Sequence, residues 1–180
     1  MMEPIEFKEP TVMDLPSKAN WMTDGTNGER KPHIINSLFL DPEGLEDHNI
    51  KLQAKYAKMK ENEVRYETYN MENAEIVTVA YGTTSRIVKN AIDALKEEGI
   101  NVGLIRPISL WPYPQKPFDD IPSTTKALLS VEMSCGQMVD DVKIAIAGKL
   151  PVDFYGRSGG MIPTPDGIMG KIKEMIGGIK

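Results

Sequence analysis

The chain has few of the residues that form disulfides or bind transition metals. Its 180 residues include one cysteine, Cys135, and two histidines, His33 and His48. A single cysteine excludes a disulfide within the chain, and these three side chains do not have the spacing of a zinc site. The low cysteine content fits a reducing compartment, so we expect a cytoplasmic protein.

Long apolar runs are also missing. A membrane-spanning helix needs roughly 20 consecutive apolar residues, whereas the apolar runs here, such as residues 144–147, are far shorter. Residues 1–10 are acidic and lack the apolar stretch of a secretory signal. We therefore expect neither a membrane association nor secretion.

Positive charge is not concentrated in any segment. The chain has 21 Lys and Arg against 26 Asp and Glu, a net charge of −5. Residues 1–74 carry the whole excess, with 9 basic against 14 acidic residues, and residues 75–180 carry 12 of each. Nucleic-acid-binding domains need a basic patch, so we expect no nucleic-acid partner.

Residues 1–73 are predicted to form an extended connecting segment with one long helix. Prolines at positions 4, 10, 16 and 32 interrupt its polar first part. Asp41 is the expected N-cap, and leucine, methionine and tyrosine then recur every seven positions up to Tyr66. The helix is therefore expected over about residues 42–66. Its apolar stripe needs a docking surface, either the following domain or a partner chain, and the sequence leaves both open.

Residues 74–180 are predicted to form an α/β domain. Residues 75–81, 102–105, 126–132 and 151–155 are rich in β-branched or apolar side chains and are expected strands. Amphipathic patterns follow three of these strands and predict helices. Their expected starting points are the turn at Gly82, Gly136 and the capping residue Thr164. Strands that alternate with helices indicate a mostly parallel sheet in a three-layer α/β fold.

The loops after the four strands are expected to meet at one edge of the sheet, where open parallel sheets bind ligands. The first loop contains Gly82, Thr83 and Thr84, whose backbone N–H groups could hold an anion at the start of a helix. This loop lacks the lysine of a phosphate-binding P-loop. A threonine that caps a buried helix is therefore the favoured alternative.

The loop after the third strand contributes Glu132, Gly136 and Gln137 as further candidates. Glu132 could hydrogen-bond to a cofactor or to a neighbouring loop, and a capping or solvated carboxylate is the favoured interpretation. Cys135 lies near the same helix start, where a thiolate is favoured. Neither histidine is near it in sequence to act as a base, so we do not expect a catalytic cysteine.

Two arginines complete the set of candidates. Arg106 and Arg157 could bind a carboxylate or a phosphate, and structural salt bridges are at least as favoured. Gly159 and Gly160 are expected to supply a backbone turn. No nucleophile, base and orienting group come together in the sequence, so no catalytic residue is predicted.

Four segments of the domain carry a family resemblance. They are residues 79–89, 98–114 with Trp111-Pro-Tyr-Pro114, 131–142 with Gly136-Gln-Met138, and 156–161. In this order they resemble domain II of the α subunit of 2-oxoacid:ferredoxin oxidoreductases, and the 2-oxoisovalerate or branched-chain type looks most similar. The resemblance implies a fold like the C-terminal domain of transketolases.

The resemblance also implies a function. Such enzymes oxidatively decarboxylate a 2-oxoacid to an acyl-CoA and pass electrons to ferredoxin, using thiamine diphosphate, Mg²⁺ and iron–sulfur clusters. The expected partners are a thiamine-diphosphate-binding chain and a ferredoxin-like chain. The thiamine domain that opens a full α subunit has no counterpart here, and one cysteine cannot replace the four thiolates of a cluster. We therefore expect an architectural subunit or fragment with no cofactor of its own and no activity alone.

Two other functions stay open at this point. A stand-alone anion- or nucleotide-binding module, centred on residues 82–85, would bind a ligand as an isolated chain. A purely structural interaction domain would use the helix at about residues 42–66 to join a complex that is not an enzyme.

Overall fold

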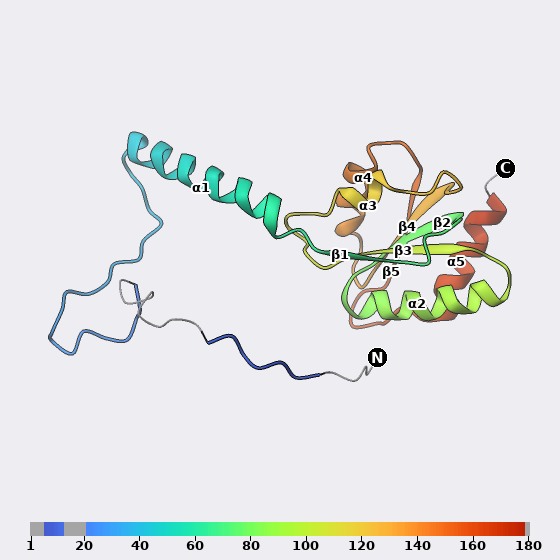
Figure 1. The fold of residues 1–180 in the computed structure, drawn as a ribbon, viewed down its shortest axis with the longest axis horizontal. Coiled ribbons are helices and arrows are strands. Elements are labelled where there is room, and N and C mark those ends of the chain that lie inside the picture. The colour runs from blue at the N-terminus through green and yellow to red at the C-terminus, as the bar shows by residue number, and fades with distance from the viewer. Residues whose placement is uncertain (1–5, 13–20, 179–180) are drawn as a thin grey trace. The chain divides into compact units, whose positions relative to one another are not determined.

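The structure is a computed structural model that describes residues 6–12 and 21–178 (Figure 1). The chain divides into two units, Met2–Lys55 and Tyr56–Lys180. Two of the prolines expected to interrupt the first segment, Pro4 and Pro16, lie outside the described residues.

The predicted long helix is present as α1, Pro42–Asn62. The carboxylate of Asp41 accepts a hydrogen bond of 2.7 Å from the backbone N–H of Gly44, which confirms Asp41 as the cap. None of the residues of α1 is buried. The helix ends at Asn62 and not near Tyr66 as predicted, because Tyr66 belongs to a strand. Across the described ranges, no helix is both long and apolar enough to cross a membrane.

A five-stranded sheet forms the centre of the second unit, in the order β1-β3-β2-β4-β5 (Figure 1). Four strands are parallel to one another, as predicted. They are β2 (Ile76–Val79), β3 (Val102–Pro107), β4 (Ala127–Glu132) and β5 (Val152–Gly156). Each end of the predicted strands lies within two residues of the observed end.

The fifth strand was not predicted. β1, Tyr66–Tyr69, pairs antiparallel with β3 at one edge of the sheet. Its four residues are too few to show a clear alternating pattern, and tertiary pairing with β3 decides their conformation. The pairing places a strand of the sheet in the stretch that the sequence analysis assigned to the connecting segment. The division into a connecting segment and a transketolase-like domain stays a prediction.

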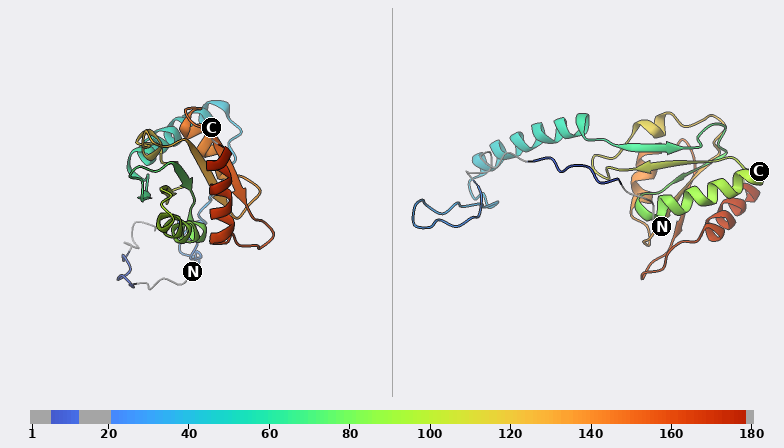
Figure 2. Two further views of the ribbon diagram at one scale, coloured as in Figure 1. Left: turned by 90° about the vertical axis from the view of Figure 1, so that its right-hand side faces the viewer. Right: turned by 60° about the horizontal axis from the view of Figure 1, so that its bottom comes forward.

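Helices cover both faces of the sheet and give the predicted three layers. α2 (Gly82–Glu97) and α5 (Pro165–Gly178) lie side by side on one face (Figure 2). α3 (Lys116–Asp119) and α4 (Met138–Ile146) contribute to the core on the other face. Thr164 accepts a hydrogen bond of 3.2 Å from the backbone N–H of Gly167, which confirms the predicted cap of α5.

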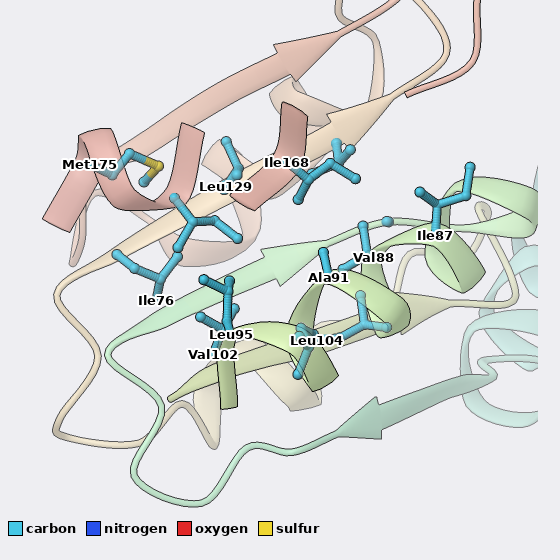
Figure 3. Close-up of a cluster of buried hydrophobic side chains, with 14 of the residues drawn as sticks. Ile76, Ile87, Val88, Ala91, Leu95, Val102, Leu104, Leu129, Ile168 and Met175 are labelled. Atoms are coloured by element: carbon cyan, nitrogen blue, oxygen red, sulfur yellow. The ribbon is translucent and has the colours of Figure 1, made fainter. Parts of the chain in front are cut away.

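The sheet separates the hydrophobic core into two clusters. Neighbouring residues of a strand face opposite sides, so Leu128 and Leu129 of β4 belong to different clusters. The larger cluster lies between the sheet and the helices α2 and α5 (Figure 3). Its helical members include Val88, Ala91 and Leu95 of α2, all completely buried. Both faces of the central strands are therefore covered by helices and shielded from solvent. This is why the four residues of β2 are all buried.

We expect Leu129→Ala to lower the free energy of unfolding by about 2–5 kcal/mol, because it leaves a cavity in the larger cluster. Leu129 is completely buried. Urea denaturation followed by circular dichroism measures the change. The matched control is Leu110→Ala, whose side chain is 47% exposed, and it should change stability by less than about 0.5 kcal/mol. Equal effects of the two substitutions would contradict the assigned core.

Candidate functional site

The candidate site lies where the winding of the chain reverses. From β2 the chain passes through α2 to β3 on one side, and then returns to β4 on the other side of β2. The carboxyl ends of β2 and β4 are therefore neighbours at a topological switch point, where open α/β sheets bind ligands. All six candidate residues lie at this switch point: Gly82, Thr83 and Thr84 begin α2 just after β2, Glu132 ends β4, and Gly136 and Gln137 lie in the loop between β4 and α4.

Glu132 is the most constrained residue of this edge. Its side chain is buried, and its two carboxylate oxygens accept five hydrogen bonds. Three of the donors are backbone N–H groups at the start of α4, from Gln137 (3.0 Å), Met138 (3.0 Å) and Val139 (2.8 Å). The other two are the hydroxyls of Ser130 and Ser134, each at 2.9 Å. The carboxylate thus ties the end of β4 to the beginning of α4.

The hydrogen bonds keep Glu132 ionised in spite of its burial. Burial alone would raise the pKa of Glu132, but the backbone N–H groups of Gln137 and Met138 and the hydroxyls of Ser134 and Ser130 outweigh it. The pKa therefore lies below its ordinary value. The positive end of the α4 macrodipole acts in the same direction. The capping interpretation of Glu132 is confirmed, and a role as a cofactor ligand stays a prediction.

Ser130 and Ser134 were not recognised from the sequence. Ser130 precedes Glu132 by two residues, so the two side chains share one face of β4. The hydroxyl of Ser134 donates to Glu132 and accepts a hydrogen bond of 3.0 Å from the backbone N–H of Gly136. The sequence does contain a signal for this arrangement, because a serine lies two residues before and another two residues after a glutamate at the end of a predicted strand.

Gly136 is required by the backbone of this loop. Its φ is +107°, a value that favours glycine, and an added Cβ would lie 3.3 Å from Cγ1 of Val139. Gln137 contributes its backbone N–H to Glu132, while its side chain is exposed. Both residues thus shape the loop, and their binding of a cofactor stays a prediction.

The start of α2 differs from the start of α4. Tyr81 is its N-cap residue and makes no side-chain capping bond, and the first turn has no acidic residue. The favoured threonine cap is therefore wrong. Instead, the Ser85 hydroxyl donates a 2.7 Å hydrogen bond to the carbonyl of Gly82. The partial positive charge of the helix start is thus not neutralised by the side chains of its own first turn.

The two arginines have different surroundings. Nη1 of Arg106 lies 2.9 Å from Oε2 of Glu67 on the neighbouring β1, which confirms the salt-bridge alternative for Arg106. The backbone N–H of Arg157 donates to the carbonyl of Glu132 at 3.1 Å. This bond joins the loop after β5 to the end of β4. Anion binding by the Arg157 side chain stays a prediction.

Cys135 is exposed and lines a pocket of about 340 Å³ between α4 and β5. The pocket is also lined by Asp140, Lys143 and Phe154. Gly159 and Gly160 have φ of +65° and +84°, which confirms the predicted turn. In the described part of the chain, no three Asp, Glu, His or Cys side chains gather where they could hold a metal ion.

Comparison with known protein families and sequences gives a consistent match. A family described as pyruvate:ferredoxin oxidoreductase core domain II matches residues 74–168. The ketoisovalerate oxidoreductase subunit VorB of Methanothermobacter marburgensis is 43% identical over 98% of this chain and 49% of its own length. The 2-oxoglutarate synthase subunit KorA of the same organism is 31% identical over 75% of this chain and 36% of its own length. The chain thus spans half or less of the length of these curated relatives.

Solved structures agree on the fold. A 2-oxoglutarate:ferredoxin oxidoreductase from Magnetococcus marinus has a TM-score of 0.67 at 23% identity, over 86% of this chain and 28% of that chain. A split-gene transketolase has a TM-score of 0.53 at 16% identity, over 64% of this chain and 42% of that chain. These likenesses confirm the predicted transketolase-like α/β architecture.

We expect Glu132→Gln to lower the free energy of unfolding at neutral pH by about 2 kcal/mol, because a neutral amide cannot accept all five hydrogen bonds. The pKa of Glu132 is depressed in the folded state from an ordinary 4.5, so the ionised carboxylate stabilises the fold above about pH 4.5. This contribution is lost as the pH falls through the folded pKa. The difference between wild type and variant should therefore shrink in acid.

Urea denaturation between pH 7 and pH 3 measures that difference. The control is Glu75→Gln, which removes a solvent-exposed ion pair with Lys126 and should cost less than about 1 kcal/mol. A Glu132→Gln effect that does not change with pH would show that the charge of Glu132 is not its cause.

We expect Tyr113→Phe to leave stability unchanged or to raise it by up to about 1 kcal/mol. The Tyr113 hydroxyl is buried without a hydrogen-bond partner among the described residues. Burial, and then the negative charges of Asp141 and Glu132, raise the pKa of this hydroxyl. The control is Tyr69→Phe, which removes a 2.6 Å hydrogen bond to Asp93 and should destabilise by about 0.5–1 kcal/mol. A larger loss from Tyr113→Phe than from Tyr69→Phe, in thermal unfolding, would contradict the assignment.

Proposed function

This chain belongs to the family of the pyruvate:ferredoxin oxidoreductase core domain II, and from that premise we propose that it is the domain II portion of a 2-oxoacid:ferredoxin oxidoreductase α subunit. The proposed reaction is the oxidative decarboxylation of a 2-oxoacid to an acyl-CoA, with ferredoxin as the electron acceptor. The observation that carries the proposal is the match of 98% of the chain to a ketoisovalerate oxidoreductase subunit at 43% identity.

The proposed substrate is a branched-chain 2-oxoacid such as 2-oxoisovalerate. A second ketoisovalerate oxidoreductase subunit, from Methanothermobacter thermautotrophicus, is 42% identical over 98% of this chain. The 2-oxoglutarate synthase subunit of Methanothermobacter marburgensis reaches 31% over 75%. The higher identity over a longer stretch supports the branched-chain type.

The proposed cofactors of the complex are thiamine diphosphate with Mg²⁺, and iron–sulfur clusters. The described residues do not fit these groups by themselves, because they bring no cluster of acidic side chains together for Mg²⁺. The whole chain has one cysteine, and an iron–sulfur cluster usually takes four thiolates. We therefore place the cofactors on partner chains, a thiamine-diphosphate-binding chain and a ferredoxin-like chain, in a cytoplasmic complex.

The proposed contribution of this chain is architectural. Glu132 holds the loop of Ser134 and Gly136 in one conformation at the switch point, and Arg157 joins the next loop to the same strand end. The α2 helix start presents backbone N–H groups at the same edge. A rigid edge of this kind can present a shaped surface to a partner without supplying a reacting group.

A second candidate function is an anion-binding module. The absence of a side-chain cap or an acidic residue in the first turn of α2 favours it, because a helix start of this kind attracts phosphate or carboxylate groups. It predicts that the isolated chain binds a diphosphate compound, whereas the oxidoreductase proposal predicts no such binding without partners.

Reconstitution tests the proposal. The chain is combined anaerobically with a polypeptide that carries the other half of the α subunit and with the thiamine-diphosphate-binding and ferredoxin-like chains of its source organism, and CoA-dependent reduction of ferredoxin is measured with 2-oxoisovalerate, pyruvate and 2-oxoglutarate. We expect activity from the complete mixture, with the highest kcat/KM for 2-oxoisovalerate, and none from the chain alone. The control mixture lacks this chain.

Full activity of the control mixture would contradict the proposal, as would a failure of this chain to form a complex with the other components. A higher kcat/KM for 2-oxoglutarate would overturn only the substrate assignment. Calorimetric titration of the isolated chain with thiamine diphosphate separates the second candidate, which predicts heat of binding where the first predicts none.

A further inference from the structure

Exposed apolar side chains of the second unit gather at one edge of the sheet. Tyr81 follows β2, Met133 follows β4, and Met161 follows β5. Four more lie on these loops and on the loop after β3, and they are Ile108, Leu110, Trp111 and Ile162. Of the large exposed apolar residues described between positions 56 and 178, only Ile144 lies elsewhere, near the far end of α4. We call these seven residues the apolar edge.

The opposite edge of the sheet has a different character. The loops there carry charged side chains such as Glu98, Lys126 and Lys149, each of which forms an ion pair. An even scatter of exposed apolar residues is ordinary, but their concentration at one end of a domain marks an interaction surface. The asymmetry therefore points to a partner at the carboxyl edge.

A groove of about 530 Å³ continues the apolar edge beside Trp111. Val64 and Tyr113 line it together with Trp111, and the ring of Tyr56 packs edge-on against the indole with the ring centroids 5.4 Å apart. Lys60 and Lys116 also line the groove, and neither forms an ion pair with another described residue. An apolar side chain flanked by carboxylates is the complementary occupant.

The length of the relatives supports one occupant. Ketoisovalerate oxidoreductase subunits contain the equivalent of this chain as 49% of a single longer polypeptide. In such a polypeptide the other half is available to cover an apolar edge of this kind. Removing apolar side chains from water is favourable, so a surface with several exposed Met and Trp side chains favours a stable contact.

We propose that the apolar edge and the groove beside Trp111 are the docking surface for the other half of the oxidoreductase α subunit, for which the greater length of the relatives leaves room. This inference rests on the proposed function and adds the surface and its chemistry. The contact is apolar at Met133 and Met161, and the two lysines of the groove pair with carboxylates of the partner.

Charge substitutions on this surface test the inference in the reconstituted complex. Met133 and Met161 are 44% and 54% exposed, so the double variant Met133→Glu, Met161→Glu should fold normally. The matched control is Ile144→Glu, because Ile144 is 76% exposed and lies outside the apolar edge. Affinity for the chain that carries the other half is measured by biolayer interferometry, and unfolding midpoints verify that each variant is folded.

We expect the double variant to bind at least tenfold more weakly than wild type, and Ile144→Glu to bind within twofold of it. A photo-crosslinking residue placed at position 133 should join that same partner chain, and one placed at position 144 should not. Lys60→Glu with Lys116→Glu should weaken binding further and reduce its dependence on salt.

Equal affinities of the double variant and wild type, in a complex that assembles and is active, would overturn the inference and leave the proposed function intact. Crosslinks from position 133 to a second copy of this chain, or to the ferredoxin-like chain, would also overturn it. Failure of the wild-type chain to join any of the oxidoreductase chains would overturn the proposed function as well.

Discussion

The buried carboxylate of Glu132 is the interaction on which the geometry of this edge depends. It accepts hydrogen bonds from three backbone N–H groups at the start of α4 and from two serine hydroxyls, so it joins a strand end, a loop and a helix start through one group. A carboxylate in this position stabilises the start of α4 in two ways. It satisfies backbone groups that the helix start leaves without intrahelical partners, and it places a negative charge at the positive end of the α4 macrodipole. The neighbouring start of α2 has no such group, so the two helix starts at the switch point differ in charge.

Much of this architecture can be predicted from sequence pattern, because its determinants are local. The four parallel strands have β-branched or apolar runs, and Asp41 and Thr164 are caps that can be recognised from the capping residue and the proline and helical pattern after it. The features that sequence reasoning missed depend on distant partners. β1 is a strand because Glu67 and its neighbours pair with β3 almost forty residues later in the chain. The start of α2 has threonines and a serine in its first turn, yet the Ser85 hydroxyl bonds to the Gly82 carbonyl instead of capping the N–H groups.

The candidate residues illustrate the same limit for function. Their common location could be predicted, because parallel strands with crossover connections bring the loops after them to one edge. Their roles could not, because the role of a carboxylate depends on its surroundings in three dimensions. Glu132 has five donors within the chain, and two of them come from Ser130 and Ser134, which the sequence did not single out. The apolar edge was also invisible in the sequence, since Met133 and Met161 are indistinguishable from core methionines until their exposure is known.

The antiparallel strand β1 has a consequence for the boundaries of the folding unit. The family match begins at residue 74, yet the backbone of β3 finds its outer hydrogen-bonding partners at Tyr66–Tyr69, and Arg106 finds its counter-ion at Glu67 on the same strand. Without β1, the longer strand β3 would lie at the edge of the sheet, with a row of unpaired N–H and C=O groups to which another strand could add. The unit that folds is therefore longer than the unit that the family defines. A recombination or gene-splitting event that preserved the fold would have to cut the chain before β1. The boundary at which this module can be separated therefore lies N-terminal to Tyr66.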